Sequence, residues 1–112
     1  MILVPSSITV FPNSSTVIEG FNLILECHAS GNPVPNITWT KDGTVWSGLL
    51  SIDTSSFPIT VESVLNISSV HRSDNGIYQC VAQNGVGNQV TNQATVTVWC
   101  KYIMVYINLT VC

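Results

Sequence analysis

The residues that could do chemistry are few, and they are not grouped as a catalytic or metal site requires. Cys27 and Cys80 lack the C-x-x-C spacing of thiol-exchange catalysts and zinc knuckles. His71 and Ser73 have the side chains of a base and a nucleophile, but both fall in one turn, whereas a triad draws its members from separate elements. His28 stands alone on the outward face of its strand. We therefore expect no catalytic residue and no metal ligand.

Acid–base pairs and phosphate-binding loops are also missing from the pattern. The six carboxylates are scattered singly, so no two of them are placed as an acid and a base. The glycine-rich segment 84–87 joins two predicted strands, while phosphate loops lead from a strand into a helix. We expect a chain that is not an enzyme and needs no cofactor. Such a domain can still accompany a catalytic module elsewhere in its parent protein.

Composition indicates a single globular domain with a weakly charged surface. The chain has 112 residues, of which 46% are hydrophobic and 8% charged, which suits one core and is far from disorder. Its net charge of −3 leaves no basic patch for phosphates, so nucleic acid is excluded as a partner. Residues 1–4 are too short for the apolar stretch of a signal peptide and are predicted to be a leader stub.

Many short strands and no helix are predicted by the alternation of Val, Ile and Thr between turn residues. The predicted strands span 7–11, 16–18, 23–29, 37–40, 61–67, 77–83 and 94–98, with a short edge strand near Val45 after the Asp42-Gly43 hairpin signal. Segment 47–58 is polar and is expected to be irregular. The side chains predicted to face the core are Leu23, Leu25, Cys27, Ala29, Ile37, Trp39, Ser63, Leu65, Ile67, Tyr78, Cys80 and Ala82.

Four strings together resemble an immunoglobulin domain of the intermediate set: LILEC, ITW, SDNGIYQC and AQNGVG. They combine the Cys…Trp…Cys order with a Tyr two residues before the second Cys. The resemblance covers residues 5–98, which we expect to form the domain. It implies an all-β fold, an immunoglobulin-like Greek-key β-sandwich of two antiparallel sheets. The short connection between Asp42 and Val61 favours this smaller set over the variable type.

The resemblance also implies roles for the core residues. It implies a disulfide between Cys27 and Cys80, with Trp39 packed against it. Trp46 is expected near an edge of the sheet. The Tyr78 hydroxyl is expected to bond to backbone a few residues upstream, and Leu25 and Leu65 are expected in the same core. In many relatives the Asp of the D-x-G-x-Y-x-C motif pairs with a basic residue. In this sequence that Asp is Asp74, and the candidate basic partners are Lys41 and Arg72. We favour the simpler interpretation that Asp74 caps the corner turn through backbone.

Four glycosylation sequons of the form N-x-[ST] begin at Asn13, Asn36, Asn66 and Asn108. A chain this rich in Asn, Ser and Thr produces some sequons by accident. Asn36 and Asn66 are nevertheless expected on outward faces, because their neighbours face the core. Glycans there would keep a weakly charged surface soluble. Together with a disulfide they indicate an extracellular protein, secreted or displayed on a cell surface.

The sequence predicts a recognition and cell-adhesion module from a larger cell-surface or secreted protein, binding a protein partner homophilically or heterophilically. The alternative is an intracellular structural module of a giant muscle or scaffolding protein.

A glycan at Asn66 would shield the four-stranded sheet, so the opposite face is the predicted binding surface, unless its residues are ordinary solvated strand positions. That face carries Thr38, Thr40, Gln79, Val81, Gln83, Thr95 and Thr97, uncharged and with one apolar residue near the middle.

Residues 99–112 are expected to be an apolar tail outside the domain. The run between Lys101 and Asn108 is far shorter than the roughly 20 apolar residues of a membrane helix, so no membrane span is expected within this chain. Its alternation predicts a strand, either the first of a neighbouring domain or sequence foreign to the native protein. We expect the tail to fray or aggregate when the chain is isolated.

Overall fold

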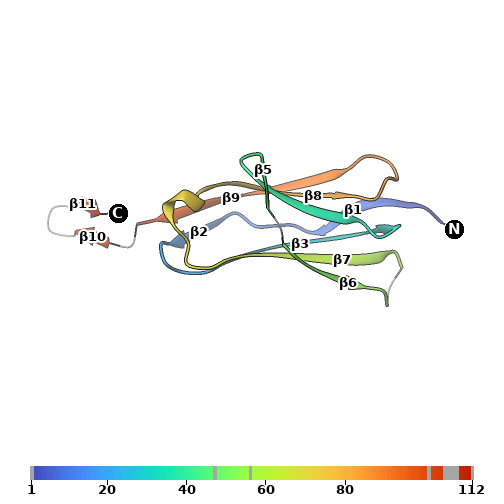
Figure 1. Ribbon diagram of the computed structural model, residues 1–112, viewed down its shortest axis with the longest axis horizontal. Coiled ribbons are helices and arrows are strands. Elements are labelled where there is room, and N and C mark those ends of the chain that lie inside the picture. Colours follow the sequence, from blue (N-terminus) through green and yellow to red (C-terminus); the bar gives the residue numbers. More distant parts are fainter. Residues whose placement is uncertain (1, 47, 56, 101, 105–108, 112) are drawn as a thin grey trace.

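The computed structural model describes residues 2–46, 48–55, 57–100, 102–104 and 109–111 and shows two sheets packed face to face (Figure 1). The four-stranded sheet contains, in spatial order, β1 (Val4–Val10), β3 (Leu23–Asn32), β7 (Ile59–Ile67) and β6 (Leu49–Asp53). The five-stranded sheet contains β2 (Ser15–Ile18), β9 (Val90–Trp99), β8 (Gly76–Gln83), β4 (Asn36–Lys41) and β5 (Thr44–Trp46). The expected immunoglobulin-like β-sandwich is confirmed.

One strand pair departs from the antiparallel expectation. Strand β2 pairs with β9 in parallel, with Ser15 opposite Val96 and Ile18 opposite Trp99. The chain leaves β1 at Phe11 and crosses to the other sheet without reversing its direction, so β2 runs alongside β9 rather than against it. All other strand pairs of the two large sheets are antiparallel within the described residues.

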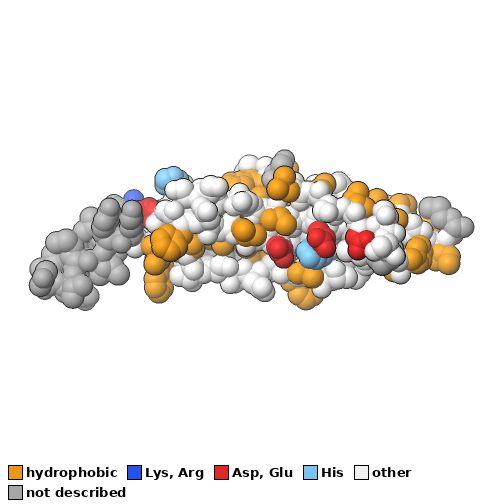
Figure 2. Space-filling model, turned by 90° about the horizontal axis from the view of Figure 1, so that it is seen from below, with side chains coloured by type: hydrophobic (Ala, Val, Ile, Leu, Met, Phe, Trp, Pro, Cys, Tyr) orange, Lys and Arg blue, Asp and Glu red, His pale blue; other side chains and the backbone are white. Residues whose placement is uncertain are grey.

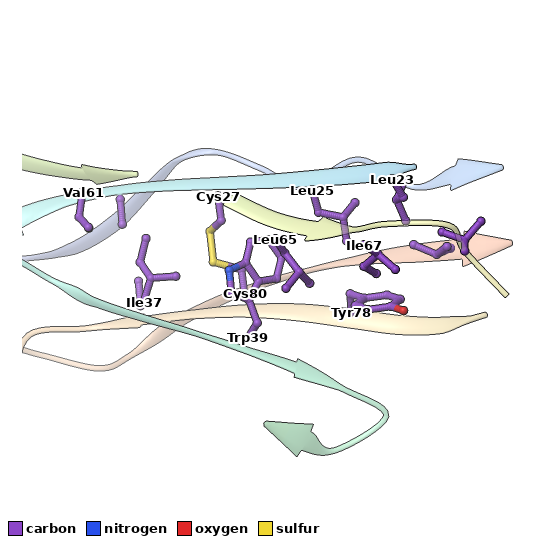
Figure 3. Close-up of a cluster of buried hydrophobic side chains, with 14 of the residues drawn as sticks. Leu23, Leu25, Cys27, Ile37, Trp39, Val61, Leu65, Ile67, Tyr78 and Cys80 are labelled. Carbon is purple, nitrogen blue, oxygen red and sulfur yellow. A yellow bond between two sulfur atoms is a disulfide. The ribbon is translucent and has the colours of Figure 1, made fainter. Parts of the chain in front are cut away.

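Alternation along the central strands produces the core. In β3 every second side chain from Leu23 to Gly31 is buried, and Val61 to Ile67 of β7 alternate in the same way. Side chains from the two sheets meet between the layers (Figure 3). The core cluster comprises Leu23, Leu25, Cys27, Ala29, Ile37, Trp39, Val61, Leu65, Ile67, Val70, Tyr78, Cys80, Ala82, Val96 and Val98.

The expectation that residues 47–58 are irregular is wrong, because β6 lies within this segment. Its register sets Leu49 opposite Val64 and Asp53 opposite Thr60 of β7. All five β6 residues are exposed, so the strand has no alternation of buried and exposed positions. A strand held only by backbone pairing along one side leaves no hydrophobic pattern to detect.

The last strand of the sandwich ends close to the expected domain boundary at residue 98, and that boundary stays a prediction. Strand β9 continues to Trp99, whose carbonyl accepts a hydrogen bond from the Glu19 N–H at 2.9 Å. Beyond it, β10 (Tyr102–Met104) pairs with β11 (Leu109–Val111) as a separate two-stranded sheet. The tail thus has strands at 102–104 and 109–111 rather than one described strand, residues 105–108 lie outside the described residues, and the independence of the tail from the domain stays a prediction.

Removing residues 100–112 should change the melting temperature by only a few degrees. In the described part of the chain, β10 and β11 form ladder hydrogen bonds with each other and not with either large sheet. Thermal unfolding of the shortened chain, followed by circular dichroism, measures the effect. A large drop would show that the tail packs on the sandwich.

Candidate functional site

The two sheets are joined covalently at the centre of the core. Cys27 on β3 and Cys80 on β8 form a disulfide, with their Cα atoms 6.5 Å apart and neither residue exposed. The pairing implied by the family resemblance is therefore present. The two cysteines are 53 positions apart in the sequence, so the disulfide closes a long loop. Closing a loop of this length constrains the unfolded chain, and the chain-entropy model gives a stabilisation of about 4 kcal/mol. Its role is structural, since both sulfurs are enclosed.

A hydrogen bond crosses the core beside the disulfide. Trp39 of β4, which is opposite Cys80 in register, donates its Nε1–H to the Ser63 hydroxyl at 2.8 Å. Ser63 of β7 is in turn opposite Cys27. Both partners are fully buried, so this bond satisfies two polar groups that would otherwise be costly. The alternation of residues 61–67 predicts Ser63 on the inward face but does not predict its partner.

Gly48, the residue directly before β6, lies close to this bond. A Cβ on Gly48 would lie 2.8 Å from the Ser63 hydroxyl oxygen and 2.9 Å from the Trp39 indole nitrogen. Both distances are too short for real carbon contacts, so glycine is required by close approach. Nothing in the sequence marks Gly48 as part of the core, because the constraint comes from residues far along the chain.

The turn before β8 has the expected tyrosine corner. The Tyr78 hydroxyl donates to the Asp74 carbonyl at 2.7 Å. The Asp74 carboxylate accepts from the His71 N–H, also at 2.7 Å, so the predicted backbone cap is confirmed. Asn75 Oδ1 accepts the Val98 N–H at 2.7 Å and ties the turn to β9. These bonds fix where β8 begins relative to its neighbour.

Burial raises the pKa of Tyr78 to about 12, and the nearby negative charges of Asp74 and Asp42 add to the shift. The ring is also in edge-on contact with Trp46, with centroids 5.8 Å apart. Trp46 lies on the edge strand β5, as expected, but it is half-buried against the core.

The outward face of the five-stranded sheet is formed by rows of uncharged side chains. One row contains Thr38, Val81 and Thr91, which are adjacent on β4, β8 and β9. All seven residues predicted for the binding surface lie on the three strands of these rows. Thr38, Gln83, Thr95 and Thr97 are exposed, and Thr40, Gln79 and Val81 are half-buried.

Four residues extend this face beyond the sequence prediction, one of them Thr91 of the row just described. Val45 on β5 is opposite Thr40 and is 72% exposed, and Ile77 on β8 is 46% exposed. Gln93 on β9 is opposite Gln79. The face thus carries more than the one apolar residue expected. Ile77 and Gln93 are in phase with predicted residues on their own strands, and that alternation would have identified them.

The opposite face, on the four-stranded sheet, has a different character. His28 of β3 has its ring nitrogens 3.9 Å from a Glu26 carboxylate oxygen and 4.0 Å from a Glu62 oxygen. Figure 2 views this side of the molecule and shows a histidine between acidic side chains, with hydrophobic side chains at several places around them. On the same face, Asn66 is exposed beside Ile24.

Three of the four sequons lie on exposed positions. Asn13 precedes β2, Asn36 begins β4 and Asn66 lies on β7. Asn108 is outside the described residues. Asn36 is opposite Gln83, at one end of the uncharged face.

Within the described residues, no cluster of His, Cys, Asp or Glu could hold a metal ion. His71 lies exposed just before the corner turn and Ser73 lies exposed within it. The His71 N–H donates to the Asp74 carboxylate, and the Ser73 carbonyl accepts from the Lys41 ammonium group. Among the residues that the structure describes, no helix has the length and apolar character needed to cross a membrane.

The disulfide, the tryptophan beside it and the tyrosine corner lie in a segment that matches a known domain family. The model of the immunoglobulin domain family matches residues 5–84, which include both disulfide cysteines, Trp39 and Tyr78. The chain belongs to the immunoglobulin domain family. In the five-stranded sheet one strand, β5, lies beyond β4. Immunoglobulin domains are in general non-catalytic modules.

Curated relatives of this immunoglobulin domain include much longer proteins. Protein amalgam of Drosophila melanogaster is 42% identical over 76 residues, 68% of this chain and 21% of that protein. The human netrin receptor DCC is 38% identical over 91 residues, 81% of this chain and 6% of the receptor. The chain thus spans only a small part of either relative.

Solved immunoglobulin structures have the same fold. The tandem Ig repeats of Dlar superpose with a TM-score of 0.72 at 34% identity, covering 88% of this chain and 50% of that one. Titin domain M7 gives the same TM-score at 26% identity, covering 88% of this chain and 97% of that one.

Ser63→Ala should lower the free energy of unfolding by about 1–3 kcal/mol, because the buried indole N–H of Trp39 loses its acceptor. Urea denaturation measures the change. Ser51→Ala, an exposed serine on β6, is the matched control and should stay within about 0.5 kcal/mol of the wild type. Equal effects of the two substitutions would contradict a role for the Trp39–Ser63 bond.

Tyr78→Phe should flatten the pH dependence of stability above pH 10. Because the pKa of Tyr78 is raised from 10 to about 12, the folded state keeps the phenol proton in a range where the unfolded state has lost it. This contribution is complete below pH 10 and is lost as the pH rises through about 12. Urea denaturation of the wild type and of Tyr78→Phe at a series of pH values measures the free energy of unfolding of each protein. The difference between the two curves isolates the contribution of Tyr78 from that of other titrating groups. Parallel curves would contradict it.

Proposed function

We propose that this immunoglobulin domain is a non-catalytic extracellular recognition and adhesion module, which binds a protein partner through the outward face of its five-stranded sheet. The observation that carries the proposal is the continuous uncharged surface across β4, β8 and β9. Its central row places Val81 between two threonines, and Ile77 and Val45 add exposed apolar area. Centres of protein interfaces are depleted in charge, and this surface shares that property.

An extracellular location is supported by three independent features. The inter-sheet disulfide belongs to an oxidising compartment, since cytosolic proteins keep their thiols reduced. Asn13, Asn36 and Asn66 are accessible to glycosylation. One relative is by name a receptor. The intracellular alternative has support from the likeness to a titin domain, but that likeness concerns the fold alone and accounts for neither the disulfide nor the sequons.

Glycans would favour one sheet face over the other. A glycan on Asn66 stands on the outer face of the four-stranded sheet, beside Ile24, and shields it. A glycan on Asn36 sits at the end of the five-stranded face, where Asn36 is opposite Gln83. The usable area therefore runs from the row of Thr38 and Val81 toward the row of Ile77 and Thr95.

The double substitution Val81→Asn and Gln83→Thr places a new sequon at the centre of the proposed face. The side chains of Ala82 and Cys80 remain in the core. Binding of the full ectodomain to its partner, or cell aggregation by it, should be lost once a mobility shift on glycosidase treatment confirms the added glycan. Undiminished binding with the glycan in place would show that another surface is used.

A matched glycan on the opposite sheet provides the control. Glu62→Asn with Val64→Thr creates a sequon on outward positions of β7 and leaves the buried Ser63 unchanged. This variant should bind like the wild type. If both glycans abolish binding equally, the loss reflects bulk rather than a specific face.

A further inference from the structure

The four lateral edges of the two sheets differ in how well they are protected against pairing with another strand. An edge strand exposes unpaired backbone N–H and C=O groups, and proteins commonly protect it by bulges, prolines, charges or short length. Edge strand β1 contains Pro5 and two register shifts. Edge strands β2 and β5 are only four and three residues long.

Strand β6 has none of these protections over most of its length. It pairs with β7 over five residues without a register shift, and all five are exposed. Leu49, Leu50 and Ile52 are 75%, 55% and 56% exposed. Asp53 is the only charged residue of the strand and lies at its end. Among the described edges of the two large sheets, β6 is therefore the open, regular and apolar one, and an extended strand can satisfy its backbone groups.

We propose that β6 is a self-association edge, which pairs antiparallel with β6 of a second copy of this chain about a twofold axis at Ser51. In this register each Leu50 is opposite Ile52 of the other copy, so the same apolar pair forms twice. Leu49 is opposite Asp53, and the two aspartates are not opposed. Aliphatic pairs directly across two strands stabilise a sheet, whereas directly opposed like charges destabilise it.

The sequence of β6, Leu-Leu-Ser-Ile-Asp, favours a second copy of the same strand as its partner. A twofold at Ser51 sets the apolar residue on one side of Ser51 opposite the apolar residue on the other side in the second copy, so one strand complements itself. Leu50 and Ile52 point to the same side as the buried Ser63 and Val61 opposite them, yet remain more than half exposed. A paired strand would cover them.

Pairing of this kind joins two four-stranded sheets into one continuous sheet. The outward face of the five-stranded sheet remains free in both copies, so self-association at β6 goes beyond the proposed function and is compatible with it. A single strand pair buries less than the roughly 1,200 Å² typical of stable complexes. The contact should therefore be weak in dilute solution and form where molecules are concentrated.

Disulfide trapping of Ser51→Cys tests the twofold register. Residues directly opposite in an antiparallel pair have Cα atoms about 4.5–5.5 Å apart, within the range that disulfides bridge. Under mild oxidation the full chain carrying Ser51→Cys should form covalent dimers at least about tenfold faster than one carrying Thr16→Cys, an exposed position on the β2 edge. Non-reducing electrophoresis over a concentration series measures both rates.

A charge placed on the edge should abolish the effect. In the Ser51→Cys background, Ile52→Lys should reduce trapping to the Thr16→Cys rate, because a lysine would then face Leu50 of the second copy. Ile24→Lys is the matched control: Ile24 is 58% exposed, close to the 56% of Ile52, but lies on the sheet face away from the edge. It should leave trapping unchanged. Melting temperatures confirm that each variant is folded.

Two results would overturn the proposal. One is trapping of Ser51→Cys at the Thr16→Cys rate, and the other is trapping that Ile52→Lys leaves unchanged. If Ser51→Cys is not trapped while Ile52→Lys weakens binding to a different protein, the β6 edge pairs with a strand of that partner, and self-association is wrong. Loss of binding in the Val81→Asn and Gln83→Thr variant bears only on the sheet face, so the two proposals fail separately.

Discussion

The structure depends on one cross-sheet contact at its centre, where a covalent and a polar link lie side by side. Cys80 and Trp39 are neighbours in one sheet, and Cys27 and Ser63 are neighbours in the other. The disulfide joins the cysteines, and the indole N–H joins Trp39 to Ser63. Together they set the spacing and register of the two layers. A charge-poor domain of this size gains its specificity from such buried, fully satisfied groups.

The tyrosine corner connects the buried core to the surface of the five-stranded sheet. Tyr78 is buried two residues before Cys80 and bonds to the Asp74 carbonyl, while Asn75 bonds to β9. The start of β8 and its register with β9 are thereby fixed. The uncharged rows on the outer face are consequences of that register, because a slip of one residue would turn every side chain of a strand to the other face.

The surfaces of the sandwich are specialised in different ways. The five-stranded face is uncharged and has exposed apolar residues, whereas the four-stranded face carries the Glu26, His28 and Glu62 group and the Asn66 sequon. The edges differ as well, since of the described edge strands in the two large sheets β6 is the one that combines regular pairing, exposure and apolar side chains over five residues. A module that contacts one partner by a face and another by an edge needs this separation.

The sequence by itself determined the fold class, the inward faces of the central strands and the positions of Cys27, Trp39, Tyr78 and Cys80, because burial of alternate residues leaves a pattern of period two in any strand that covers a core. Only the tertiary structure decided the features that depend on neighbours distant in the chain. These are the strand β6, the parallel pairing of β2 with β9, the Trp39–Ser63 bond and the requirement for Gly48. Alternation tells which side of a strand is buried, but an edge strand with no buried side leaves no such pattern, and the partner of a buried hydroxyl is set by sheet packing.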